Sequence, residues 1–310
     1  MDSTPIILAH DFPPFFRIHS TGRVERYHRH DFVSPSHDPL TGVASKDVSI
    51  SAENGASARI YLPTADPGRK LPLLVYIHGG AFCIESAFSS FYHRYLNALA
   101  SRSRSVVVSV EYRLAPEHPI PACYEDAHAV VEWVGSHSGS EPGPNPWLND
   151  RADFSRAYVA GDSAGANIAH DMVVRSSVSG PGIGLRFSGL ILIHPYFGAG
   201  KPEKLWDFLC PDSKGAGDVR LNPAADPDQL ARLGCDRVLV CVAEKDLLRN
   251  RGLIYCEGLR KSGFRGPVEL FESVGEGHVF HLLDPVCDGS GVLMDRVVGF
   301  ISGSSVRAHF

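Results

Sequence analysis

From about residue 70 onward, short apolar runs alternate with amphipathic stretches along the chain. Such runs are typical of parallel strands that are buried on both faces, and the amphipathic stretches are typical of helices that cover a sheet. The pattern predicts strands over 73–77, 106–110, 157–160, 189–193, 238–243 and 268–271, and helices over 91–100, 124–134, 166–175, 250–261 and 291–301. The predicted fold class is therefore α/β, with a mostly parallel central sheet and the carboxyl ends of its strands at one edge.

Two segments interrupt this alternation. Residues 1–45 are rich in Phe, His and Pro without sustained periodicity, so we expect a covering arm rather than a core element. Residues 196–227 contain Trp206, Phe208 and several Pro and Gly residues but no periodic strand or helix, and we expect an insertion over the functional site. The prediction is one domain over residues 1–310, with these two segments as its lid.

An antiparallel hairpin is predicted before the first parallel strand. Two strand-like stretches, 46–51 and 58–62, flank Asn54-Gly55, a residue pair that favours tight hairpin turns. We therefore expect an antiparallel pair to start the sheet.

The composition narrows the classes of function. With 310 residues, of which 44% are hydrophobic, the chain can bury one large core. Its net charge of −5, with the basic residues scattered, argues against binding to nucleic acid or to an anionic membrane surface and favours a small-molecule partner. No apolar run reaches the roughly 18 residues of a membrane helix, and the first residues do not resemble a secretory signal. The oligomeric state is left open.

The seven cysteines indicate a compartment. Their number is odd, they lie mostly inside apolar segments, and no Cys-x-x-Cys pair suggests a zinc or redox site. This usage is typical of buried free thiols in a reducing environment, so we expect a cytoplasmic or nuclear protein.

Residues 161–165, Gly-Asp-Ser-Ala-Gly, carry the first candidate for chemistry. They lie between the predicted strand over 157–160 and a helix-like stretch that begins at Ala166. A strand, a serine between glycines and a helix are the context of a nucleophile elbow, where the chain turns so sharply that bulky neighbours would clash. Ser163 is therefore the candidate nucleophile, with its hydroxyl exposed at the tip of the turn. The pentapeptide alone arises often by chance, so the assignment depends on its partners.

A serine hydroxyl is a weak nucleophile and needs a base, with an acid to orient that base. Asp246 and His278 each follow a predicted strand, and they come after the serine in one of the known orders of a catalytic triad. Asp246 could instead cap a following helix, and Glu244 is a second carboxylate to consider. His281 is a second histidine near the first. The conjunction of three residue types, each after its own strand, favours Ser163, Asp246 and His278 as the catalytic residues.

A glycine-rich turn follows the predicted strand over 73–77. When a serine attacks a carbonyl group, the oxygen becomes an anion, and each backbone N–H aimed at it lowers the barrier by about 3–4 kcal/mol. The predicted oxyanion hole consists of Gly79, Gly80, Ala81 and Ala164. Of these, Gly80, Ala81 and Ala164 are the expected N–H donors. The alternative is an ordinary tight turn after a strand.

Five motifs occur in order along the chain: His78-Gly79-Gly80, Tyr112 to Glu117, Gly161 to Asn167, Ala243 to Asp246, and Gly277 to Phe280. Together they resemble the hormone-sensitive-lipase branch of the α/β-hydrolases, and the chain is similar to plant carboxylesterases over nearly its whole length. The resemblance implies the α/β-hydrolase fold and the hydrolysis of short-chain or aromatic carboxylic esters, without a cofactor or a metal.

Two departures from the family bear on substrate choice. The family usually has a third glycine where this chain has Ala81, and an alanine tolerates a positive φ poorly. The segment 197–205 is also shorter than in relatives, by about a dozen residues on the resemblance. We therefore expect an altered or more open acyl site.

The family also includes 2-hydroxyisoflavanone dehydratases and gibberellin receptors, which are the two alternative functions. In a dehydratase, the base and the oxyanion hole would serve an elimination. Some of these enzymes have threonine in place of Ser163 and others keep serine, so Ser163 makes this alternative weaker without excluding it. The receptors bind a ligand without turnover and have an aliphatic residue in place of His278. The esterase is therefore the favoured hypothesis, and the natural substrate is left open.

Arg113 and Glu117 are expected to be structural. The candidates for lining a pocket are His194, Tyr196, Trp206, Phe208 and Phe280.

Overall fold

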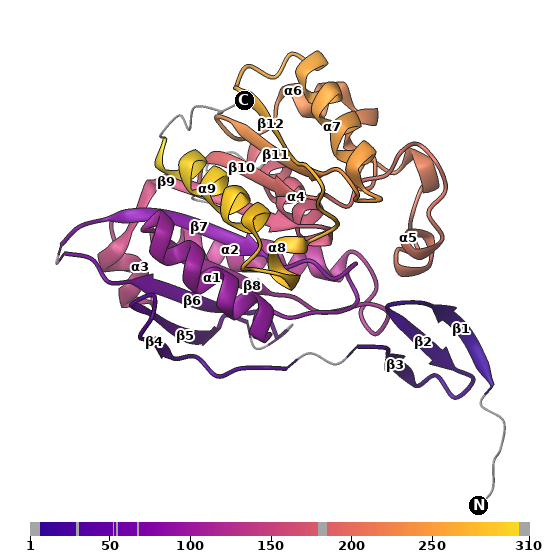
Figure 1. The fold of residues 1–310 in the computed structure, drawn as a ribbon, viewed down its shortest axis with the longest axis horizontal. Coiled ribbons are helices and arrows are strands. Elements are labelled where there is room, and N and C mark those ends of the chain that lie inside the picture. The colour runs from indigo at the N-terminus through magenta and orange to yellow at the C-terminus, as the bar shows by residue number, and fades with distance from the viewer. Residues whose placement is uncertain are drawn as a thin grey trace, which may run out of the picture.

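The central feature of the fold is a nine-stranded sheet with helices on both faces (Figure 1). The computed structural model describes residues 7–303 apart from 29, 30, 52, 54, 67 and 179–184. In spatial order the strands are β12 (Val268–Ser273), β11 (Val238–Ala243), β10 (Phe187–Ile193), β9 (Ala152–Asp162), β7 (Leu71–Ile77), β8 (Val106–Glu111), β6 (Ser57–Pro63), β5 (Val43–Ser49) and β4 (His37–Asp38). The strands from β12 to β8 are parallel, and β6, β5 and β4 extend one edge in antiparallel order.

The long helices form a layer on each face of the sheet. Helices α1 (Ser90–Ser103) and α9 (Asp288–Ser302) lie side by side across one face (Figure 1). The other face carries α2 (Ala122–Gly135), α4 (Ala164–Val178) and α7 (Arg249–Lys261). The shorter helices are α3 (Pro146–Arg151), α5 (Lys204–Leu209), α6 (Pro227–Ala231) and α8 (Phe280–Leu283). None of the described helices is both long enough and apolar enough to cross a lipid bilayer.

Strand β7 shows why the central strands are apolar throughout. Leu73, Val75 and Ile77 pack in the core beneath α2 and α4, whereas Leu74 and Tyr76 pack in the core beneath α1 and α9. Because successive side chains point to opposite faces, both faces of a central strand must be apolar when helices cover both.

The α/β prediction is confirmed. Each of the six predicted parallel strands and each of the five predicted helices is present, with its ends shifted by a few residues. The antiparallel hairpin of β5 and β6 is also present. Asn54 of its predicted turn lies outside the described residues.

The amino-terminal arm is more structured than expected. Strands β1 (Leu8–Phe12), β2 (Phe16–His19) and β3 (Val24–Arg26) form a separate antiparallel sheet that projects beside the main body (Figure 1). The limit of the arm at residue 45 was wrong, because β4 and the fully buried Val43 belong to the central sheet. Strands β1, β2 and β3 do not alternate between buried and exposed positions, so the sequence shows no two-residue periodicity there.

The expectation that residues 196–227 contain no helix was also wrong. This segment holds α5 and two single 3₁₀ turns, Gly215–Gly217 and Pro223–Ala225. A helix of six residues, such as α5, is shorter than two turns and cannot display a helical repeat that sequence inspection would find.

The turn from β9 into α4 brings backbone unusually close to backbone. A Cβ added to Gly161 would lie 2.4 Å from the carbonyl carbon of Gly165, and one added to Gly165 would lie 2.1 Å from the carbonyl oxygen of Ile77. Both glycines therefore allow α4 to start directly against β7.

We predict that Gly165→Ala lowers the free energy of unfolding by at least about 2 kcal/mol, because the backbone must move to admit the methyl group. Gly291→Ala is the matched control, since this glycine lies in α9 and an added Cβ would meet nothing within 4 Å. The control should be neutral or stabilising by up to about 1 kcal/mol. Urea unfolding of both variants measures the difference, and equal stabilities would contradict the close approach.

Candidate active site

Ser163 lies at the sharp turn between β9 and α4. Its φ of +51° is in the left-handed region, where a non-glycine residue is uncommon. The turn is held from the neighbouring strand, because the Ser163 N–H donates to the carbonyl of Ile193 at 2.9 Å and the Ser163 carbonyl accepts from the N–H of Tyr196 at 2.9 Å. Only 5% of the residue is exposed, since its side chain lies at the base of a cavity.

The structure brings the three predicted catalytic residues together. Nε2 of His278 lies 3.0 Å from Oγ of Ser163, and Nδ1 of His278 lies 2.8 Å from Oδ2 of Asp246. The other carboxylate oxygen of Asp246 accepts from the N–H of Leu248 at 2.8 Å. Asp246 thus orients His278 and also caps the turn that follows it. The two roles considered from the sequence, triad acid and cap, are therefore both present.

The competing residues lie elsewhere. Glu244 is exposed and accepts from the N–H of Gly275 at 2.7 Å. His281 is buried, with its ring 5.0 Å from that of Tyr95. Neither contributes to the hydrogen bonds that connect Ser163, His278 and Asp246.

Asp246 is set up to remain a carboxylate. Burial by itself would raise the pKa of Asp246, but the hydrogen bond and charge of His278, together with the N–H of Leu248, lower this pKa below its ordinary value. The group can therefore balance a positive charge on the His278 ring.

The glycine-rich turn after β7 faces the same cavity. Gly80 and Ala81 line it with Ser163, and both have positive φ values, +102° and +51°. In the part of the chain that the structure describes, the N–H groups of Gly80, Ala81 and Ala164 donate to no acceptor. They remain available to an oxygen placed next to Ser163.

Gly79, which the sequence analysis included in the oxyanion hole, has its N–H engaged elsewhere. That N–H donates to the hydroxyl of Tyr92 at 2.7 Å. Gly79 also has no room for a side chain, because an added Cβ would lie 2.4 Å from Oδ2 of Asp162. Its contribution in this geometry is to let the turn approach the elbow.

Asp162 links the elbow to this turn, and sequence inspection missed its role. Its carboxylate accepts from the hydroxyls of Tyr76 at 2.9 Å and Tyr92 at 2.8 Å, and Tyr92 in turn accepts from Gly79. Burial raises the pKa of Asp162 to about 6, although the two tyrosine hydroxyls act in the opposite direction. The sequence offered one signal of this role, which is the acidic residue between Gly161 and Ser163. An acid buried at that position needs hydrogen-bond donors from other strands and helices.

A cavity of about 750 Å³ opens above Ser163. Its wall is largely apolar and includes Ile84, Phe91, Leu248 and Leu282. The arm and the insertion also contribute, through Pro14, Phe15, His28 and Tyr196.

Of the five pocket candidates, only Tyr196 lines this cavity. Phe208 instead packs against the arm, with its ring 4.7 Å from that of Phe12. Trp206 is buried against Phe82, and Phe280 is buried against His194.

The turn that follows β8 is structural, as expected. Arg113 pairs with the buried Asp126 of α2, and Glu117 pairs with Arg26 of the arm. Neither Arg113 nor Glu117 lines the cavity.

Three side chains could in principle hold a metal ion. Ligand atoms of His194, Asp246 and His278 all lie within 4.8 Å of one another. A metal at this point would compete with the hydrogen bond between Asp246 and His278. The arrangement therefore fits a hydrogen-bond network better than a metal centre.

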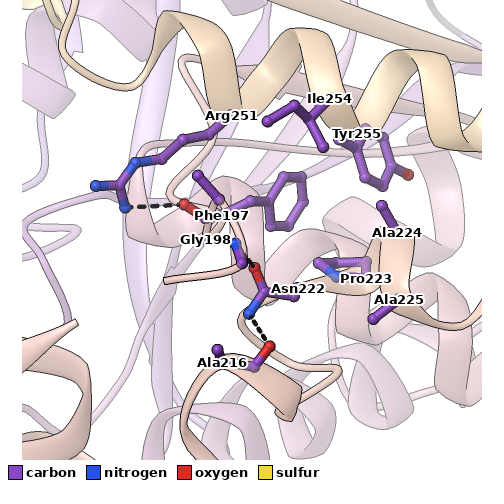
Figure 2. Close-up of a pocket in the computed structure, with 12 residues that line it drawn as sticks. Phe197, Gly198, Ala216, Asn222, Pro223, Ala224, Ala225, Arg251, Ile254 and Tyr255 are labelled. Atoms are coloured by element: carbon purple, nitrogen blue, oxygen red, sulfur yellow. Dashed lines mark hydrogen bonds between the residues drawn. The ribbon is translucent and has the colours of Figure 1, made fainter. Parts of the chain in front are cut away.

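A second, smaller pocket of about 250 Å³ lies between the segment after β10 and helix α7 (Figure 2). Arg251 donates to the carbonyl of Phe197 at 3.0 Å, and Asn222 donates to the carbonyl of Ala216 at 2.8 Å (Figure 2). It shares no lining residue with the cavity above Ser163.

Comparison with known proteins places these features in context. A family described as the α/β hydrolase fold matches residues 74–204 and 194–282, and one described as the carboxylesterase family matches residues 31–116. A 2-hydroxyisoflavanone dehydratase of Glycyrrhiza echinata is 45% identical, with 94% of this chain and 95% of the relative covered. A probable carboxylesterase 13 of Arabidopsis thaliana is 44% identical, with 96% and 98% covered. The crystal structure of a thermostable carboxylesterase cloned from a metagenomic library has a TM-score of 0.70 at 26% identity, with 89% of this chain and 91% of the other covered.

The raised pKa of Asp162 predicts a pH-dependent effect of Asp162→Asn. At pH 8 the buried carboxylate is ionised, and its charge lowers the free energy of unfolding. This destabilisation shrinks as the pH falls through about 6, the pKa in the folded protein, toward 3.8, the ordinary pKa of an aspartate. Relative to wild type, the variant should therefore gain about 1–2 kcal/mol more stability at pH 8 than at pH 5. Urea unfolding at the two pH values measures this, and the same change at both would contradict the ionised state of Asp162.

Proposed function

The chain belongs to the α/β hydrolases, among the plant carboxylesterase-like members of the hormone-sensitive-lipase branch, and we propose that it hydrolyses carboxylic esters through an acyl-enzyme on Ser163. The carboxylesterase family match and the esterases among its structural neighbours identify it as a carboxylic ester hydrolase. The observation that carries the proposed mechanism is the unbroken hydrogen-bond chain from Asp246 through His278 to Oγ of Ser163.

In the first half of the reaction, Nε2 of His278 takes the proton of Ser163 as Oγ attacks the ester carbonyl carbon. The imidazolium that forms is oriented and stabilised by the carboxylate of Asp246. The tetrahedral intermediate then loses its alcohol, which leaves with the proton returned by His278. Ser163 is left as an acyl ester.

In the second half, His278 takes a proton from a water molecule, which attacks the acyl carbon. The new tetrahedral intermediate expels Ser163, which regains its proton from His278, and the carboxylic acid is released. In both intermediates the oxyanion would accept from the N–H groups of Gly80, Ala81 and Ala164. Each such donor typically lowers the barrier by about 3–4 kcal/mol.

The cavity supports an apolar ester as substrate. Its lining offers apolar surface from Ile84, Phe91 and Leu282, and only a few polar side chains accompany the catalytic residues. A volume of about 750 Å³ admits an aromatic group as well as a short acyl chain.

The cysteines support a reducing compartment such as the cytoplasm or the nucleus. All seven are free thiols. Burial raises the pKa of Cys83 to about 12 and that of Cys241 to about 12, so neither forms a reactive thiolate at neutral pH.

A dehydratase is the second candidate, since a relative of that name is 45% identical. His278 would act as the base and the oxyanion hole would bind the substrate carbonyl group, while Ser163 would not be acylated. Incubation with 2-hydroxyisoflavanone and analysis of the products would distinguish the two. We expect no isoflavone product, and efficient formation of it would favour the dehydratase.

A receptor without turnover is less favoured. Its ligand would need the cavity but not the base, whereas His278 is present here and contacts Ser163.

We predict that Ser163→Ala lowers kcat for p-nitrophenyl acetate by about 10⁴-fold or more, because no nucleophile remains. Ser177→Ala is the matched control, since Ser177 lies near the far end of α4, is exposed, and uses its hydroxyl to donate to the carbonyl of Val174. The control should keep wild-type turnover. Undiminished turnover by Ser163→Ala would exclude the acyl-enzyme mechanism.

A further inference from the structure

The end of β10 is bonded to the turn that carries the nucleophile. The carbonyl of Ile193 and the N–H of Tyr196 bond to the N–H and the carbonyl of Ser163, each at 2.9 Å. Between them lies His194, whose own N–H donates to the carbonyl of Cys241 on β11 at 2.8 Å. The backbone of His194 is therefore fixed relative to Ser163 and to the sheet.

The side chain of His194 reaches the loop that carries the catalytic histidine. Its Nδ1 accepts from the N–H of Val279 at 3.0 Å, and Val279 directly follows His278. The rings of His194 and His278 lie 5.8 Å apart, and His194 is only 1% exposed. One short segment thus contacts both the backbone of Ser163 and the backbone next to His278.

The loop between β12 and α8 needs such a contact. The side chain of His278 is 35% exposed, so packing alone does not hold it. Val279 has a φ of +47°, which is rare for a β-branched residue. Earlier in the loop, the carbonyl of Glu276 accepts from the N–H of Lys245 at 2.8 Å. The bond from Val279 to His194 holds the other side of His278.

This contact requires a neutral His194. Because Nδ1 accepts a hydrogen bond, the proton of the ring must be on Nε2. Burial and the neighbouring His281 and His278 hold the pKa of His194 well below its ordinary value, while Asp246 acts in the opposite direction. The acceptor is therefore present at the pH values where ester hydrolysis is measured.

We propose that His194 is a positioning residue, which holds the His278 loop through the N–H of Val279 so that Nε2 of His278 stays within hydrogen-bond distance of Oγ of Ser163. His194 is not among the residues that line the cavity above Ser163, so its role is assigned through His278 rather than through contact with the substrate. The inference rests on the proposed acyl-enzyme function, because it assigns a role through His278.

Two substitutions separate the acceptor from the bulk of the ring. His194→Leu removes the acceptor, whereas His194→Asn places an amide oxygen close to the position of Nδ1. With p-nitrophenyl acetate, His194→Leu should lower kcat by about 10- to 100-fold, since a displacement of about 1 Å can cost that much, and should leave KM within about twofold. His194→Asn should keep kcat within about fivefold of wild type. Each rate is divided by the concentration of active enzyme, which is measured by labelling Ser163 with a phosphonate.

His281→Leu is the matched control. His281 is buried in the same cluster, with its ring 5.7 Å from that of His194, but it makes no hydrogen bond to the His278 loop among the described residues. This variant should keep kcat within about threefold, because His281 holds no catalytic group. Wild-type kcat in His194→Leu, or equal losses of kcat in His194→Leu, His194→Asn and His281→Leu, would overturn the proposal.

If His194→Leu does not fold, His194→Gln replaces it. The longer side chain carries its amide to the position of Nε2, so it cannot accept from Val279 in the same place, and kcat should fall well below that of His194→Asn. Equal kcat values for the two amides would overturn the proposal. Comparison with Ser163→Ala separates the two proposals. If Ser163→Ala keeps its turnover, the proposed function fails. If Ser163→Ala is inactive and His194→Leu keeps the wild-type kcat, only the role of His194 fails.

Discussion

The arrangement of the active site follows from the backbone conformation of Ser163. A serine adopts a φ of +51° only where its surroundings hold it there. Ile193 and Tyr196 hold it through two backbone hydrogen bonds, and Gly161 and Gly165 allow the following helix to pack against the neighbouring strand. The hydroxyl is thereby fixed at the edge of the sheet where the loops after several parallel strands converge.

Two buried carboxylates beside this turn are in opposite electrostatic situations. Asp246 receives hydrogen bonds from His278 and from a backbone N–H, and its pKa lies below the ordinary value. Among the described residues, Asp162 accepts from the side-chain hydroxyls of Tyr76 and Tyr92, which do not offset its burial, so its pKa rises to about 6. This difference in pKa fits the place of each residue. Asp246 can balance the charge of an imidazolium, whereas Asp162 connects the elbow to the turn at Gly79.

The cover of the cavity is built from segments far apart in the chain. Pro14 and Phe15 of the arm line the cavity, and Phe208 of the insertion packs against the arm. Arg26 anchors the arm to the main body, because its guanidinium donates to the carbonyls of Cys83 and Ala115 and to the carboxylate of Glu117. The arm is thus held by directional polar bonds as well as by apolar contact.

The central sheet, its covering helices and the candidate residues Ser163, Asp246 and His278 could all be predicted from the sequence. These depend on local periodicity and on the order of residues after strands, which the chain displays directly. The pairing of donors with acceptors could not be predicted and is seen in the folded protein: Gly79 bonds to Tyr92, Asp246 has two partners, and His194 reaches the loop of His278. Such pairings join residues distant in the sequence, and local patterns carry no record of them, because they arise only when packing brings the elements together.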